Sequence, residues 1–111
     1  TRNGLYEVTL TLPQPVPLAE LFSVSVLVRD GKSGAPVETA TVEVDARMPQ
    51  HGHGMATRPE ADPGTCAPTC THPGGKYVTS GMKFHMPGDW VVSVSVAGER
   101  GHDTVDIPVS M

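Results

Sequence analysis

Residues 89–98 read "DWVVSVSVAG", with apolar and polar side chains in near-regular alternation. This pattern assigns Trp90, Val92, Val94 and Val96 to one face and Ser93 and Ser95 to the other. Side chains along a β-strand point to opposite faces with a period of two, so a one-sided apolar pattern is typical of a strand with one buried face. The stretch therefore predicts a half-buried strand on a valine-rich core.

The same alternation recurs along the chain and predicts further strands. It is present in "LYEVTLTL" (5–12), "LFSVSVLVRD" (21–30), "VETATVEVDARM" (37–48) and "HDTVDIPVS" (102–110). Two shorter strands are predicted for "KYVT" (76–79) and "MKFHM" (82–86). Glycine, proline and aspartate separate these segments, and no long window keeps a helical period. About seven short antiparallel strands predict an all-β, immunoglobulin-like β-sandwich.

Length and charge restrict the class of protein. With 111 residues, the chain is expected to form a single domain over residues 1–111. The formal net charge is −4 and lysine and arginine do not cluster, which argues against a nucleic-acid partner. No apolar run approaches the roughly 20 residues of a membrane helix. We therefore expect membrane attachment only through an anchor that this chain lacks.

The connection over residues 48–75 has no strand pattern and carries most of the unusual chemistry. It opens with "MPQHGHGM", which supplies thioether sulfur and imidazole nitrogen from Met48, His51, His53 and Met55. These soft or borderline donors suit Cu(I) and Cu(II), whereas calcium and magnesium prefer oxygen. Loops of this length in compact domains are often functional. The segment is therefore a candidate copper site.

A second group of the same donors occurs in "GMKFHMPG" (81–88), namely Met82, His85 and Met86. If the strands run alternately up and down, both groups and the turn over residues 13–17 lie at one end of the sandwich. This expectation requires "KYVT" and "MKFHM" to be separate strands. A single continuous strand is expected to carry the second group to the opposite end.

Simpler interpretations exist for several of these residues. Met48, Met82 and Met86 fall on inward faces, where methionine commonly fills the core. His72 and His102 are expected to be ordinary surface residues. Cys66 and Cys70, in "CAPTC", are spaced to form a loop-stapling disulfide, which we favour, or a thiolate pair that handles copper.

The segments "MPQHGHGM" and "GKYVTSGMKFHMPGDWVVSVSV" (75–96) together resemble the YtkA-like domain family over residues 21–109. That family is similar to the periplasmic part of FixH-type proteins. The resemblance implies an exported, often membrane-tethered domain linked to copper handling or cytochrome oxidase assembly. Carried over to this chain, the implied ligands are Met48, His51, His53, Met55, His85 and Met86. The insertion "ADPGTCAPTCTHPGG" (61–75) departs from the simplest members, and its cysteine spacing is similar to that of Sco-type copper chaperones.

From these observations we predict a non-enzymatic, periplasmic or otherwise extracytoplasmic copper-binding protein. It would act as a chaperone or carrier that gives copper to an accepting protein such as an oxidase subunit. The alternative is a structural or interaction module with no physiological metal. An enzyme is not favoured, because no Ser/His/Asp set or pair of carboxylates stands out.

Overall fold

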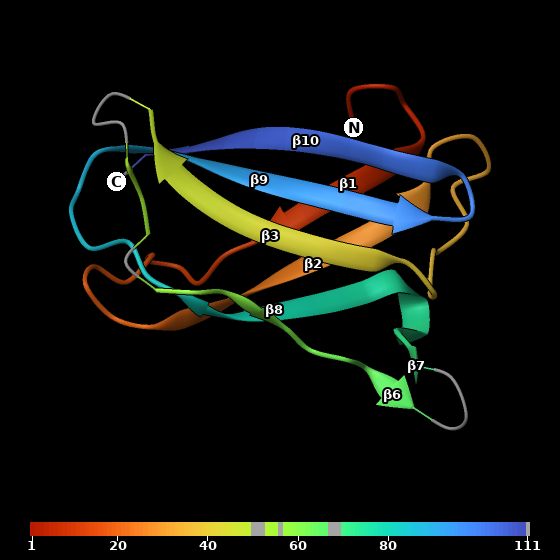
Figure 1. The fold of residues 1–111 in the computed structure, drawn as a ribbon, viewed down its shortest axis with the longest axis horizontal. Helices are drawn as coiled ribbons and strands as arrows, with labels where there is room; N and C mark the ends of the chain where they lie inside the picture. Colours follow the sequence, from red (N-terminus) through yellow and green to blue (C-terminus); the bar gives the residue numbers. More distant parts are fainter. Residues whose placement is uncertain (50–52, 56, 67–69, 111) are drawn as a thin grey trace.

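Two antiparallel β-sheets pack face to face in the computed structural model of the chain (Figure 1). The structure describes residues 1–49, 53–55, 57–66 and 70–110, and for His53, Cys66 and Cys70 it describes the backbone alone. Within this part of the chain, no helix is long and apolar enough to cross a membrane.

The strand order is that of an immunoglobulin domain. The first sheet has the order β1-β2-β8-β5, with bounds Tyr6–Thr11, Phe22–Asp30, Lys76–Met82 and Glu60–Ala61. The second has the order β10-β9-β3-β4, with bounds Gly101–Ser110, Asp89–Gly98, Thr41–Met48 and His53–Gly54. In chain order the first sheet has the ABED arrangement of the constant-type fold, and the second has its GFC arrangement with the two-residue β4 added beside β3. The predicted immunoglobulin-like β-sandwich is confirmed.

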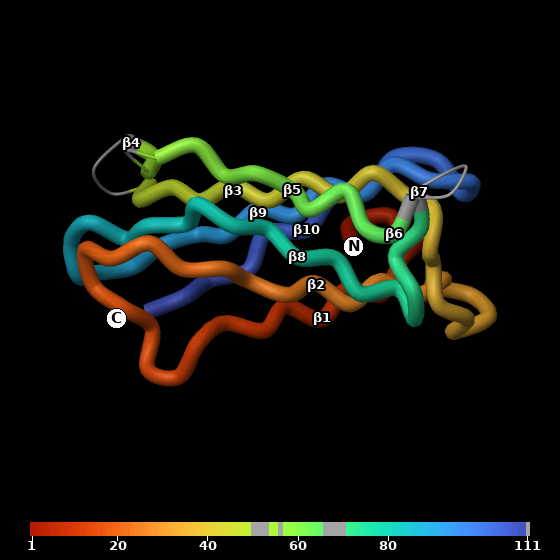
Figure 2. The backbone as a smooth tube through the Cα atoms, turned by 90° about the horizontal axis from the view of Figure 1, so that it is seen from below, coloured from red at the N-terminus to blue at the C-terminus, as the bar shows by residue number. Residues whose placement is uncertain are grey.

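The core lies between the two sheets, whose separation is visible in Figure 2. In β9 the burial alternates along the strand, and Trp90, Val92, Val94 and Val96 have no exposed surface. In β3 the exposed and buried residues alternate throughout, with Met48 as the last buried side chain. The period-two pattern therefore predicted the buried faces correctly, because only one face of each sheet is covered.

Of the two strands predicted for "KYVT" and "MKFHM", the structure has one, β8, which contains "KYVT" and continues only to Met82, the first residue of the second segment. β8 runs without interruption to Met82, and Phe84 then makes an isolated parallel bridge with Leu18. Gly81, which resembles a turn residue in the sequence, has φ +76° inside the strand. A Cβ there would lie 2.8 Å from the Arg58 carbonyl oxygen. Glycine thus admits a neighbouring backbone and a local irregularity without reversing the chain.

The connection after β3 contains short elements that the sequence did not predict. Besides β4 and β5 it includes β6 (Thr65–Cys66), β7 (Cys70–Thr71) and the 3-10 helix η1 (Pro73–Gly75). Strands of two residues are too short to show a period, so tertiary pairing alone defines them.

This connection runs the length of the sandwich before β8 returns (Figure 1). β8 consequently runs in the same direction as β3, and both end where β9 begins. The expectation that a continuous strand would separate the two donor groups is therefore wrong. The turn over residues 13–17 joins the end of β1 to the start of β2 at this same end, as predicted.

Candidate functional site

The end of the sandwich where β3, β8 and β10 finish carries the candidate donors, and we call it the methionine rim. It consists of the β3–β4 hairpin with Met55, the turn over residues 83–88, and the connection over residues 12–21. The hairpin pairs Arg47 with Gly54 and Met48 with His53. His51 lies outside the described residues, and for His53 the structure describes only this backbone register.

The turn over residues 83–88 supplies the second half of the rim. Phe84 is completely buried, and its ring stacks on Trp90 with centroids 4.6 Å apart. His85 is half-buried, and its ring meets Trp90 edge-on at 5.5 Å and 83°. Met86 packs, partly buried, against the core, and its carbonyl oxygen accepts a hydrogen bond from Trp90 Nε1 at 3.1 Å. The aromatic cluster thus holds the donor-bearing turn against the start of β9.

Two contacts join the halves of the rim. The backbone N–H of Lys83 donates to Met55 Sδ at a distance of 3.4 Å. A Cβ built at Gly88 would lie 2.7 Å from Met48 Cε, so the Met48 methyl group lies directly against the turn. Segments about thirty residues apart are therefore in contact, and their predicted juxtaposition is confirmed.

The methionines at this end differ in accessibility. Met48 is 1% exposed and Met82 is fully buried, so both belong to the core. Met55 and Met86 are half-buried, as is His85. Among the described side chains, no three or more of His, Cys, Asp and Glu come together in a group that could hold a metal ion. Thioether sulfur does not belong to that set of donors, and the side chains of His51 and His53 are not among those that the structure describes.

The cysteines lie far from the rim. Cys66 and Cys70 are direct partners in the β6–β7 hairpin, which Figure 1 shows at the opposite end of the sandwich. His72, next to this hairpin, stacks on Tyr77 with ring centroids 4.0 Å apart, so it is not the ordinary surface residue expected. Burial of Tyr77 is the main cause of its raised pKa. His102 is exposed on β10, as expected.

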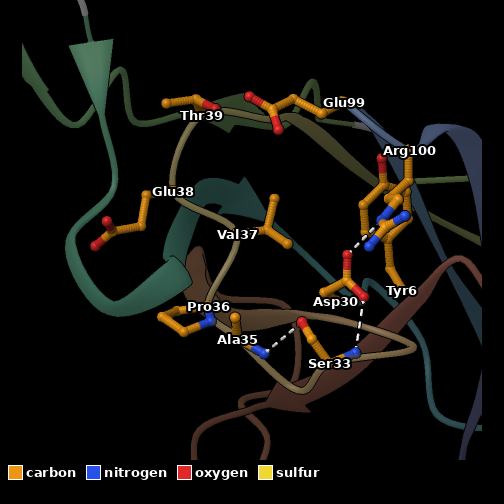
Figure 3. A pocket seen from close by; sticks show the side chains of 10 residues that line it. All are labelled: Tyr6, Asp30, Ser33, Ala35, Pro36, Val37, Glu38, Thr39, Glu99 and Arg100. Atoms are coloured by element: carbon orange, nitrogen blue, oxygen red, sulfur yellow. Dashed lines mark hydrogen bonds and ion pairs between the residues drawn. The ribbon is translucent and has the colours of Figure 1, made fainter.

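A hollow of about 480 Å³ also lies at the opposite end, between the β2–β3 connection and the β9–β10 turn (Figure 3). Several of the polar groups that line it form hydrogen bonds. Arg100 Nε contacts Asp30 Oδ2 at 2.6 Å, and Tyr6 donates its hydroxyl to the Gly101 carbonyl oxygen at 2.8 Å. The backbone N–H of Ser33, followed by Arg100, lowers the pKa of the Asp30 carboxyl. These contacts fasten the start of β1 and the end of β2 to the β9–β10 turn.

The family model for YtkA-like domains matches residues 2–95. The chain belongs to the YtkA-like family. The match spans all three segments of the methionine rim of this YtkA-like domain, and it includes the β6–β7 hairpin that carries the cysteines. Searches among curated proteins and among solved structures found no match.

Sequence analysis did not single out Trp90 or Gly88 for a role at the site. The signal for them was their position, because both closely follow the His85–Met86 pair in "HMPGDW". The contact of Gly88 with Met48 depends on the packing of the turn against β3, which local sequence does not specify.

Proposed function

We propose that this YtkA-like domain binds a copper ion at the methionine rim and carries it, outside the cytoplasm, to a copper-accepting protein. The observation that supports this most directly is the contact between Met55 Sδ and the backbone of Lys83. That contact holds a thioether of the "HGHGM" segment two residues from His85. A thioether from each segment and the imidazole of His85 are then available at one rim, and this combination suits copper.

Partial exposure of the donors favours a carrier over a permanent metal site. Met55, His85 and Met86 are all half-buried, so an approaching protein can reach a metal bound to them. Transfer by ligand exchange needs such an open site, in which an incoming donor replaces one ligand at a time. In this proposal His51 and His53 complete the site from the hairpin, and Met48 supports it from the core. An accepting subunit of a cytochrome oxidase is the partner class that family membership suggests.

The double substitution of His51 and His53 by alanine tests the site. Copper binding should be lost, because two imidazole donors are removed, while the fold survives because neither substitution alters the valine core. Binding is measured by isothermal titration with Cu(I), Cu(II) and Zn(II), with the cysteines reduced and again oxidised. His102→Ala is the matched control, since it removes an exposed histidine at the opposite end. Stoichiometric copper binding by the double variant would contradict the proposed site.

A thermal melt distinguishes the carrier from a structural module without a physiological metal. A ligand that binds only the folded state raises the unfolding midpoint in proportion to the logarithm of its free concentration. We expect a rise with copper that the double variant does not show. An equal midpoint with and without copper would favour the structural module.

A further inference from the structure

The turn that carries His85 and Met86 is fastened to β9 through one side chain, Trp90. The indole is completely buried, and Nε1–H donates to the Met86 carbonyl oxygen at 3.1 Å. A buried indole N–H needs an acceptor, and losing it would leave a polar group unsatisfied. The backbone of Met86 therefore cannot move away from β9 without breaking a bond that the interior requires.

The indole ring also fixes the residues on either side of this bond. It stacks on Phe84 at an interplanar angle of 13° and meets the His85 ring edge-on. Phe22 also contacts the Phe84 ring, in an edge-on arrangement with the centroids 5.2 Å apart. The Phe84 carbonyl oxygen accepts the N–H of Ala19 at 2.8 Å. Three consecutive residues of the turn, 84–86, thus contact one rigid aromatic cluster.

We infer that Trp90 is a positioning residue for the His85–Met86 half of the copper site, an inference that rests on the proposed function. Trp90 has no exposed surface and contributes no metal ligand. Its effect is to hold two donors in their bound arrangement before the metal arrives, so that binding does not have to order them. Substitution of residues that support metal ligands commonly lowers metal affinity by about 10- to 100-fold. The loss of a single neutral hydrogen bond corresponds to about three- to tenfold, at or below the bottom of that range.

Two variants remove the indole N–H by different routes. Trp90→Phe keeps an aromatic ring but loses the donor. Because the chain contains a single tryptophan, biosynthetic replacement by benzothienylalanine substitutes sulfur for Nε1–H and nearly preserves the ring shape. Tyr6→Phe is the matched control, because it deletes one buried aromatic donor to a backbone carbonyl at the opposite end.

Affinity for Cu(I) is measured by competition with a chromogenic chelator, with the thiols alkylated so that they bind no copper. We expect both Trp90 variants to bind about three- to tenfold more weakly than the parent, with Tyr6→Phe unchanged. The Cu(II) electron paramagnetic resonance spectrum should change in the Trp90 variants, because the two donors are no longer held in the same arrangement. It should not change in Tyr6→Phe, because a loss of stability alone leaves the ligand geometry of the folded molecules intact. Amide hydrogen exchange at residues 83–88, measured without metal, should accelerate in the same two variants.

The outcomes separate this inference from the proposed function. Parental affinity and an unchanged spectrum in both Trp90 variants would overturn the inference and leave the copper site standing. Equal weakening in Tyr6→Phe would overturn it as well, because the effect would then follow general stability. If the parent domain itself binds no copper, the proposed function and this inference fall together.

Discussion

Replacement of Met48 by alanine should destabilise the domain without directly removing a copper ligand. Met48 is 1% exposed at the end of β3, and its methyl group packs against Gly88. Truncating a buried methionine to alanine costs about 2–5 kcal/mol, through lost burial and the cavity left behind. For a domain of this size, that loss lowers the unfolding midpoint by roughly 8–25 °C.

Leucine at the same position separates packing from metal binding. Met48→Leu keeps a similar volume and loses the sulfur, so its cost should stay below about 1.5 kcal/mol. Met55→Leu makes the same chemical change at a half-buried position whose sulfur contacts the turn. We expect copper affinity to be preserved in Met48→Leu and reduced in Met55→Leu.

Urea unfolding of the metal-free proteins measures stability, and Cu(I) competition measures affinity. Parental stability in Met48→Ala would refute the assigned packing role. Loss of copper binding in a fully folded Met48→Leu would instead make Met48 a ligand. Either result would mean that the β3–β4 hairpin opens at the rim, so that Met48 leaves the core.

Further predictions concern the backbone, the pH dependence and the cysteines. Gly88→Ala should cost about 1–3 kcal/mol in urea unfolding, because position 88 has φ +140° and a Cβ there would meet the buried methionine of β3. Gly34→Ala, at φ +74° with open space, is the control that isolates the backbone contribution; equal losses would argue against the steric contact. Burial raises the pKa of Asp103, but hydrogen bonds from the Thr1 side chain and from backbone N–H groups outweigh it and lower the pKa to about 2. A carboxyl with a lowered folded pKa stabilises the fold above its unfolded value near 3.8 and loses that contribution as pH falls toward 2. Asp103→Asn should therefore flatten the decline in stability between pH 4 and pH 2, and an unchanged slope in acid unfolding would contradict this. Cys66 and Cys70 should form a disulfide, detectable as a mass change on reduction and alkylation, and copper affinity at the rim should not depend on it; a large difference between oxidised and reduced protein would implicate the thiols.

Much of the fold was predictable because period-two patterning reports which face of a strand is buried. Trp90 and the valines of β9 were assigned correctly for this reason. The predicted break between two strands at Ser80 and Gly81 was wrong, because a glycine inside a strand and a glycine in a turn look alike in the local sequence. Their difference lies in the Arg58 carbonyl that approaches Gly81 from a distant segment. The two-residue strands escaped detection for a related reason, since they depend on pairing partners.

The candidate site was predictable in its chemistry and only partly in its geometry. Residue types in "HGHGM" and "FHMPG" indicate soft metal ligands through their donor atoms alone. Their meeting at one rim was also expected, although the route differs, because the long connection crosses the molecule. The separation of the buried Met48 from the half-buried Met55 depends on contacts that no local pattern encodes.

The amino-acid sequence by itself determined the strand character, the buried faces and the donor types, because these depend on side-chain chemistry and on spacing along the chain. Tertiary structure alone decided which donors meet and which methionine fills the core. The physical reason is distance along the chain. Contacts such as Lys83 N to Met55 Sδ join residues 28 positions apart, and only the packing of whole sheets brings them together.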